Sequence, residues 1–283
     1  MNKDYIKDAI VAKLGNDVVV SFTEVEKNGV MKKAIKVQKH NAQIAPVFYY
    51  NPDDSDDKIV NFIVDGFAKN GNPGLNVDEL ADNLANWSWV KDRIYPRLYN
   101  ADKGNSVTNV ANYVLAGDVN VCFSIMLSDD DKTGTMTTKV LWNMFDEWGI
   151  SMDELTKTAK ANLNKMLVMD SMMNILFLGI ADNTKERKID MSDAMTVCTT
   201  INKTCGASAI LLLPDLIDNG EIDDMDYYIL PSSIHETIVL KGYDSGFKSM
   251  VKCVNATQVA PDDFLSDNVF KYNAATREFE VMK

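Results

Sequence analysis

Apolar and polar residues in the first quarter of the chain follow patterns that predict a helix, a hairpin and a second helix. Residues 3–14 carry apolar side chains between charged ones and are followed by Gly15, as at the end of a helix. Two apolar, β-branched runs, residues 17–25 and 30–38, flank an Asn-Gly turn, which is a strong short-range hairpin signal. Residues 56–69 have apolar side chains at helical spacing and predict the second helix.

Two later segments carry the residues of a helix capping box. In LNVDEL, Asn76 is placed to cap the helix and Glu79 to close the box. In ISMDEL, Ser151 and Glu154 have the same roles. Both segments therefore predict the start of a helix.

The rest of the chain mixes strand and helix patterns. Residues 118–127 predict a strand, which a turn connects to residues 136–145. The pattern of residues 136–145 predicts a strand at the beginning and a helix at the end. Further strands are predicted at residues 44–50, 173–180, 194–201, 207–213, 227–230 and 237–241, and a last hairpin at residues 270–281. Proline in a first turn predicts a helix over residues 213–223 and a short one at Pro261, after a strand end near Val254.

This alternation predicts an α+β fold, with mixed or antiparallel sheets built from hairpins and flanked by helices. The polar stretch 182–188 divides the chain into two predicted α+β lobes, residues 1–181 and residues 189–283. A single domain is the alternative, because 283 residues suit one large domain or two ordinary ones.

The formal net charge of −12 excludes the basic face that direct nucleic-acid binding needs. Acidic residues cluster at Asp129, Asp130 and Asp131 and at Asp223, Asp224 and Asp226. These clusters serve solubility and turns, or they offer carboxylates to a basic protein partner.

Three features of the sequence predict a cytoplasmic protein without a membrane segment. The N-terminus lacks an apolar signal core. The longest apolar stretch, residues 166–180, is shorter than the roughly 20 residues of a spanning helix. The four cysteines are scattered, as buried thiols are, and do not form a disulfide framework.

The C-terminal part of the chain resembles a known family. The strings YILPSSIHE, CGASAILLLPDLID and VNATQVAPDDFLSDNVFKYN are similar to those of an uncharacterised family of Gram-positive anaerobes, known only as a domain of unknown function. The upstream strings GDVNVCF and WGISMDELTKTAKANL resemble the same family and, more distantly, another uncharacterised bacillus-type family. The resemblance implies kinship and a role near mobile elements, and it carries over no catalytic residue.

Reactive side chains gather in the segment PSSIHE. Ser232, Ser233, His235 and Glu236 are the parts of a nucleophile–base–orienter relay. The alternative is a turn in which the serines cap and His235 is hydrogen-bonded in a partly buried position. A thiol nucleophile would need Cys198, Cys205 or Cys253 near His235, and inert buried thiols are the alternative to that.

The sequence contains no phosphate-cradling loop and no metal-ligand spacing, so we expect neither a cofactor nor a metal. We expect an acidic cytoplasmic protein that acts by binding another protein. One version is an inhibitor or mimic directed at a nucleic-acid-handling host or mobile-element protein. The alternatives are a hydrolase or transferase centred on Ser233 and His235, and an oligomeric structural subunit. The aromatic run of residues 87–99 anchors a partner or packs in the core.

Overall fold

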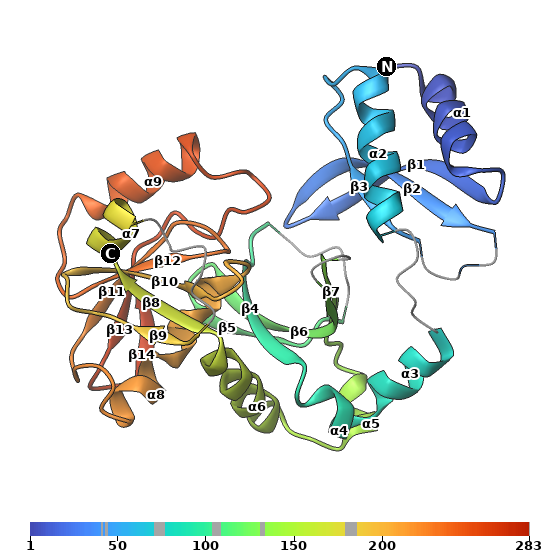
Figure 1. Cartoon of the computed structure of the whole chain (residues 1–283). Helices are drawn as coiled ribbons and strands as arrows, with labels where there is room; N and C mark the ends of the chain where they lie inside the picture. The colour runs from blue at the N-terminus through green and yellow to red at the C-terminus, as the bar shows by residue number, and fades with distance from the viewer. Residues whose placement is uncertain are drawn as a thin grey trace.

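The computed structural model describes residues 1–40, 42, 45–70, 77–103, 109–130, 134–178 and 186–282. A small N-terminal body stands beside a larger one, and a hairpin of the small body points toward the larger one (Figure 1). The small body consists of α1 (Lys3–Leu14), β1 (Val18–Lys27), β2 (Val30–Lys39), β3 (Val47–Tyr49) and α2 (Asp56–Asn70).

The small body has its own sheet and core. Its strands are antiparallel in the order β1-β2-β3, and its helices bury Ile6 and Ile63 against Ile35 of the sheet. The predicted hairpin turn is confirmed: Asn28 and Gly29 both have positive φ, 49° and 74°. Gly29 also needs its small size, because a Cβ there would lie 2.4 Å from the carbonyl oxygen of Lys103 in the larger body.

The first sheet of the larger body is organised around one long strand. β6 (Val119–Asp130) pairs antiparallel with β4 (Ile94–Asn100), β5 (Asn112–Ala116) and β7 (Gly134–Lys139). The helices before and after it are α3 (Val77–Ala85), α4 (Trp87–Val90), α5 (Met144–Trp148) and α6 (Met152–Lys165). β4 alternates between buried and half-buried residues along its length, so it presents one apolar and one polar face.

The second sheet of the larger body has the order β14-β13-β11-β12-β10-β8-β9, antiparallel except for β8 and β9. Its strands are β8 (Leu167–Ser171), β9 (Lys188–Ile189), β10 (Met195–Thr200), β11 (Tyr227–Pro231), β12 (Thr237–Leu240), β13 (Phe270–Asn273) and β14 (Glu278–Val281). The buried helices η1 (Gly206–Leu212, a 3-10 helix) and α8 (Leu213–Asp218) pack on one side, and α9 (Phe247–Thr257) packs on the other.

One hydrophobic core joins both sheets of the larger body. It includes Phe123 of β6, Leu167 of β8, Leu211 of η1 and Tyr272 of β13. The predicted boundary at residues 182–188 falls largely on residues outside the described ones, and β8 before it pairs with β10 after it. The division into lobes of residues 1–181 and 189–283 stays a prediction.

The predicted α+β class is confirmed, and so are most of the predicted elements. The Ser151 cap is also confirmed, because its side chain accepts a hydrogen bond from the backbone N–H of Glu154. The Asn76 cap lies outside the described residues. The described part of the chain contains no helix that is both long and apolar enough to cross a membrane.

Four element predictions were wrong. Residues 173–180 were predicted as a strand, but Met172–Leu178 form helix α7, and the strand is β8 just before it. Residues 207–213 were predicted as a strand, but residues 207–212 lie in η1 and Leu213 begins α8. η1 is buried on all sides and so shows no one-sided pattern. The strand end near Val254 is the last part of α9, and the segment at Pro261 is a turn without a helix.

Candidate functional site

The segment PSSIHE forms a tight loop between β11 and β12, and its serines are used within that loop. The Ser232 hydroxyl donates to the carbonyl oxygen of Glu236 at 3.1 Å. The Ser233 Oγ accepts from the backbone N–H of His235 at 3.0 Å. These bonds belong to a turn, which was the alternative interpretation of this segment.

The His235 imidazole bonds to two other segments of the chain. Its Nδ1 accepts from the backbone N–H of Cys205 at 3.0 Å, and its Nε2 lies 3.2 Å from Oδ1 of Asp263. The side chains of His235 and Asp263 are 34% and 27% exposed, so solvent reaches both. Within the described residues neither ring nitrogen bonds to Ser233, so the predicted Ser–His relay is not formed in this geometry.

Cys205 reaches His235 through an unusual backbone conformation. Its φ is 51°, a left-handed value that is uncommon for a residue with a Cβ. Gly206 follows it and allows η1 to approach the loop closely, because a Cβ there would lie 2.6 Å from the carbonyl oxygen of His235. Cys205, His235 and Asp263 are far apart in the sequence, so only the tertiary structure brings them together.

Cys205 lines a cavity of about 340 Å³. The cavity has three walls: the turn of the β1–β2 hairpin, the polar face of the β4–β6–β7 sheet, and the loops before η1 and β12. Its lining residues are Glu26, Lys27, Asn28, Arg97, Leu98, Tyr99, Cys122, Ser124, Thr137, Lys139, Thr204, Cys205 and Ile234. This lining contains three cationic side chains and one acidic side chain.

Arg97 lies on the sheet wall of this cavity. It is paired in register with Cys122 of β6, and its neighbours Ile94 and Leu98 on β4 face the buried core. Within the part of the chain that the structure describes, no carboxylate or carbonyl pairs with the Arg97 guanidinium. Sequence reasoning missed this residue, although the alternation of apolar and polar residues over 94–100 was a signal for it.

Cys122, Arg97, Lys139 and Cys205 all line this cavity, and the other three affect the ionisation of the Cys122 thiol. Burial raises the pKa of the Cys122 thiol to about 11. Lys139 and Arg97 lower that pKa, and the neighbouring Cys205 raises it. The two thiols and the two cations therefore share one region of the cavity. Burial also raises the pKa of the Cys198 thiol, which lies in the core away from solvent.

The hairpin turn is fastened over the cavity by the segment 262–264. Lys32 and Lys27 bond to the Asp262 carboxylate at 2.6 and 3.1 Å. The Asn28 side-chain amide donates to the carbonyl oxygens of Asp262 and Phe264 at 3.1 and 2.8 Å. Burial opposes ionisation of Asp262, whereas the two lysines hold its pKa below the ordinary value.

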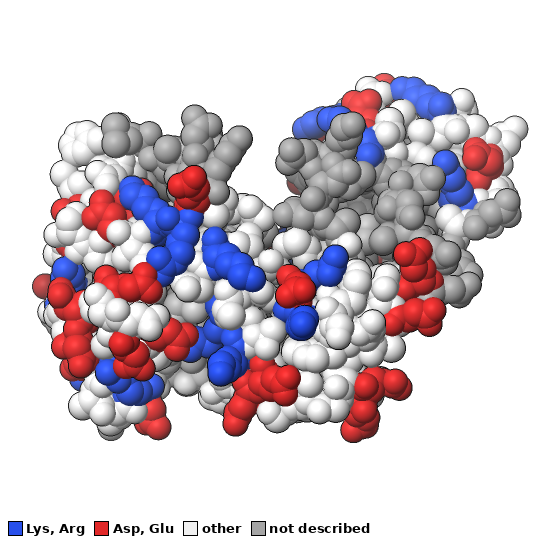
Figure 2. Space-filling model, turned by 60° about the horizontal axis from the view of Figure 1, so that its bottom comes forward, with Lys and Arg blue, Asp and Glu red and all other residues white. Residues whose placement is uncertain are grey.

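The acidic cluster that was predicted as a partner-binding surface is paired within the chain. Asp226 bonds to Lys271 at 2.7 Å, and Asp223 lies 3.6 Å from Lys241. Asp224 pairs with Arg277 at 3.3 Å. On the face shown in Figure 2, acidic and basic side chains are interspersed.

The second predicted acidic surface, Asp129 to Asp131, is described only in part. Asp129 and Asp130 lie in β6 without described side chains, and Asp131 lies outside the described residues. The described residues contain no group of His, Cys, Asp and Glu side chains that could hold a metal ion.

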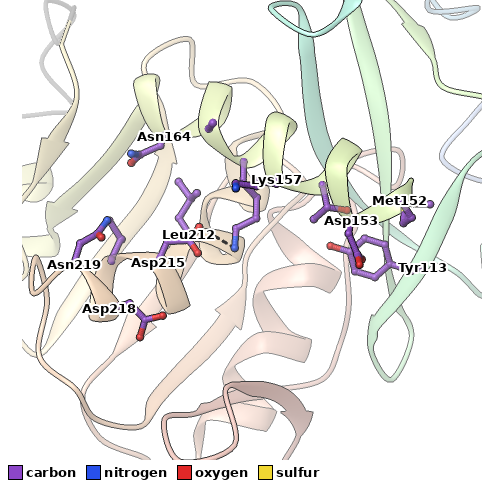
Figure 3. A pocket seen from close by; sticks show the side chains of 13 residues that line it. Tyr113, Met152, Asp153, Lys157, Asn164, Leu212, Asp215, Asp218 and Asn219 are labelled. Atoms are coloured by element: carbon purple, nitrogen blue, oxygen red, sulfur yellow. Dashed lines mark ion pairs between the residues drawn. The ribbon is translucent and has the colours of Figure 1, made fainter. Parts of the chain in front are cut away.

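A larger and more open groove of about 990 Å³ lies between α6 and α8 (Figure 3). Lys160 of α6 and Asp215 of α8 form an ion pair at 2.8 Å within it. Its other lining residues include Tyr113, Asp153, Thr156, Lys157 and Asp218. The described residues that line this groove include no cysteine and no histidine, unlike the surroundings of Cys205.

Comparisons with known proteins give a family and no relative of known activity. A model for a family of unknown function (DUF5688) matches residues 2–274. No curated protein and no solved structure matches the chain. The resemblance to an uncharacterised family is thus confirmed at that level, and the link to Gram-positive anaerobes stays a prediction.

Proposed function

The chain belongs to the family of unknown function DUF5688, and we propose that it is a binding protein for a small molecule with a phosphate or carboxylate group. The binding site is the cavity between the β1–β2 turn, the β4–β6–β7 sheet and the loops before η1 and β12. The observation that carries this proposal is Arg97, a cavity-lining guanidinium without a partner among the described residues.

The chemistry of the cavity supports an anionic ligand. A guanidinium offers paired donors that fit carboxylate and phosphate oxygens. Lys139 and Lys27 add positive charge to the lining, and Lys27 also pairs with Asp262. Tyr99, Ser124 and Thr137 also line this space, and their hydroxyls are neutral hydrogen-bonding groups.

The size and the charge of the cavity also support a small anionic ligand. A volume of about 340 Å³ falls within the range of small-molecule sites. The whole chain carries a formal charge of −12, so a locally cationic cavity departs from its surroundings. Such a local field concentrates anions, and low dielectric walls strengthen it.

Calorimetric titration of the full chain with inorganic pyrophosphate and with succinate tests this proposal. We expect binding of at least one of the two probes, and a loss of about tenfold or more in affinity for Arg97→Gln. Arg277→Gln is the matched control, because Arg277 pairs with Asp218 and Asp224 at the surface, outside the cavity. Equal affinities of Arg97→Gln and the unchanged chain, or no heat from either probe, would overturn it.

A protein partner is the second candidate function, and the groove between α6 and α8 is the observation that favours it. Ala161 is an exposed residue of α6 that lines this groove, so Ala161→Arg would occupy it without disturbing the core. We expect a partner captured from a lysate by the tagged chain to be lost with Ala161→Arg. If the variant retains the partner, this groove is excluded as the binding site. If binding of the partner weakens with salt, the acidic surfaces become the candidate site.

A further inference from the structure

Two opposite charges line the proposed anion-binding cavity from different walls. Arg97 lies on the sheet wall, and Glu26 lies on the wall that the β1–β2 hairpin forms. We propose that the ligand of this cavity is a small zwitterion, whose carboxylate or phosphate group binds Arg97 and whose ammonium group binds Glu26. The anionic end of the ligand rests on the proposed function, whereas the role of Glu26 in binding a cation does not.

Glu26 is a half-buried carboxylate near the end of β1, where it lies opposite Met31 of β2. Within the described part of the chain, no side chain forms an ion pair or a hydrogen bond with the Glu26 carboxylate. The adjacent Lys27 pairs instead with Asp262 at 3.1 Å. A carboxylate that loses part of its hydration is stabilised by a cation that donates hydrogen bonds to it, so Glu26 is suited to bind an ammonium group.

The separation of Glu26 and Arg97 favours a ligand that carries both charges. The two side chains share a cavity of about 340 Å³, yet they form no ion pair with each other. A purely anionic ligand would bring a like charge toward Glu26, and a purely cationic one would bring a like charge toward Arg97 and Lys139. A zwitterion that is oriented with its anionic end toward the sheet and its cationic end toward the hairpin avoids both repulsions.

The rest of the lining limits the ligand to a small molecule with a short carbon chain. The cavity volume lies at the lower end of the range for small-molecule sites. Ile234 adds an apolar group to the lining, and Tyr99 adds an aromatic one. An amino acid and an aminoalkyl phosphate both fit this description, because each carries an ammonium group and an anionic group on a short chain.

Calorimetric titration of the full chain with two matched pairs of probes tests this proposal. Succinate and L-aspartate differ by one ammonium group, and so do ethyl phosphate and O-phosphoethanolamine. We expect the ammonium-bearing member of at least one pair to bind about tenfold more tightly than the other member. The pair that shows this preference identifies the anionic group of the ligand as a carboxylate or as a phosphate.

The variant Glu26→Gln should have opposite effects on the two members of that pair. It should weaken binding of the ammonium-bearing member about tenfold, because the carboxylate that pairs with the ammonium is lost. It should tighten binding of the purely anionic member about threefold, because a like charge leaves the cavity. A merely structural role of Glu26 would weaken both. Glu24→Gln is the matched control, because Glu24 is an exposed residue of the same strand outside the cavity lining and should change neither affinity.

The variant Arg97→Gln tests the anionic end separately. It removes the guanidinium that both members of a pair would bind, so both affinities should fall about tenfold or more. The ratio between the two affinities should be retained, because that ratio depends on Glu26. Thermal melting checks that each variant is folded.

The outcomes distinguish the zwitterion from the proposed function. Equal affinities within both pairs, together with a loss of binding in Arg97→Gln, would overturn the zwitterion and keep the anion site. A preference for the ammonium that persists in Glu26→Gln would overturn the role of Glu26. A preference that Glu26→Gln removes, with affinities that Arg97→Gln leaves unchanged, would overturn the anion site and keep Glu26 as a cation-binding residue. No heat from any of the four probes would overturn both proposals.

Discussion

The two faces of the β4–β6–β7 sheet carry out different tasks with neighbouring residues. On one face Leu98, Phe123 and Ile125 are buried in the core that joins both sheets of the larger body. On the other face Arg97, Cys122 and Lys139 line the cavity. Because successive side chains of a strand point to opposite sides, one residue step separates what stabilises the fold from what binds. Stability and binding should therefore be separable by mutation.

The largest effect should come from the core face. Phe123→Ala removes a fully buried ring from the centre of β6 and leaves a void. We expect a loss of about 3–5 kcal/mol in the free energy of unfolding, measured by chemical denaturation. A loss below about 1 kcal/mol would contradict the assignment of different roles to the two faces, because it would show that this face contributes little to the stability of the core.

A smaller effect should come from the fastening of the hairpin over the polar face. Asp262 has a side chain that is 8% exposed and bonds to Lys27 and Lys32. Asp262→Asn removes the carboxylate that both lysines share and leaves Lys27 only the more distant Asp263 carboxylate at 3.9 Å, and we expect it to cost about 2–3 kcal/mol. Lys58→Gln is the control, because Lys58 pairs with Asp54 on the surface and should cost well under 1 kcal/mol.

Acid should remove part of the same contribution. The lysines hold the pKa of Asp262 below its ordinary value, so folding stabilises the ionised form. This stability is fully present above the ordinary pKa of about 4 and is lost as the pH falls through the lower folded value. The unfolding free energy of the unchanged chain should fall more steeply below about pH 4 than that of Asp262→Asn. Parallel curves would contradict this assignment.

The smallest change in stability should come from the cavity face itself. Arg97→Gln removes no core contact and no ion pair among the described residues, so we expect a change within about 0.5 kcal/mol. The same variant should have the largest effect on anion binding. A loss of several kcal/mol in the free energy of unfolding would mean that Arg97 holds the sheet together, and the separation of the two faces would fail.

Local signals predicted the fold where each segment decides its own conformation. The Asn28–Gly29 turn and the Ser151 cap depend on a few adjacent residues and were predicted correctly. The strand predicted at residues 173–180 and the one at 207–213 are apolar runs, and a short apolar run does not distinguish a strand from a buried helix. Tertiary packing decided both.

The residues of the candidate site also differ in how far the sequence could predict them. His235 was singled out from the sequence because it lies beside several other reactive side chains, and the adjacent serines were taken as its partners. The true partners, Cys205 and Asp263, are 30 and 28 residues away, and no local rule connects them. Arg97 was read as part of an aromatic run, although its strand alternates regularly. A site built from loops of several elements becomes visible only when those loops are placed in space.

The segment 262–264 connects the turn of the β1–β2 hairpin to His235, in the loop before β12. Asp262 and Phe264 hold the hairpin turn through Asn28, and Asp263 between them holds His235. Thermodynamic linkage makes such an arrangement reciprocal: a ligand that favours one position of this segment must tighten the docking of the hairpin by the same free energy. A ligand bound in the cavity would then slow the hydrogen exchange of the backbone amides around Asn28, in the hairpin of the N-terminal body.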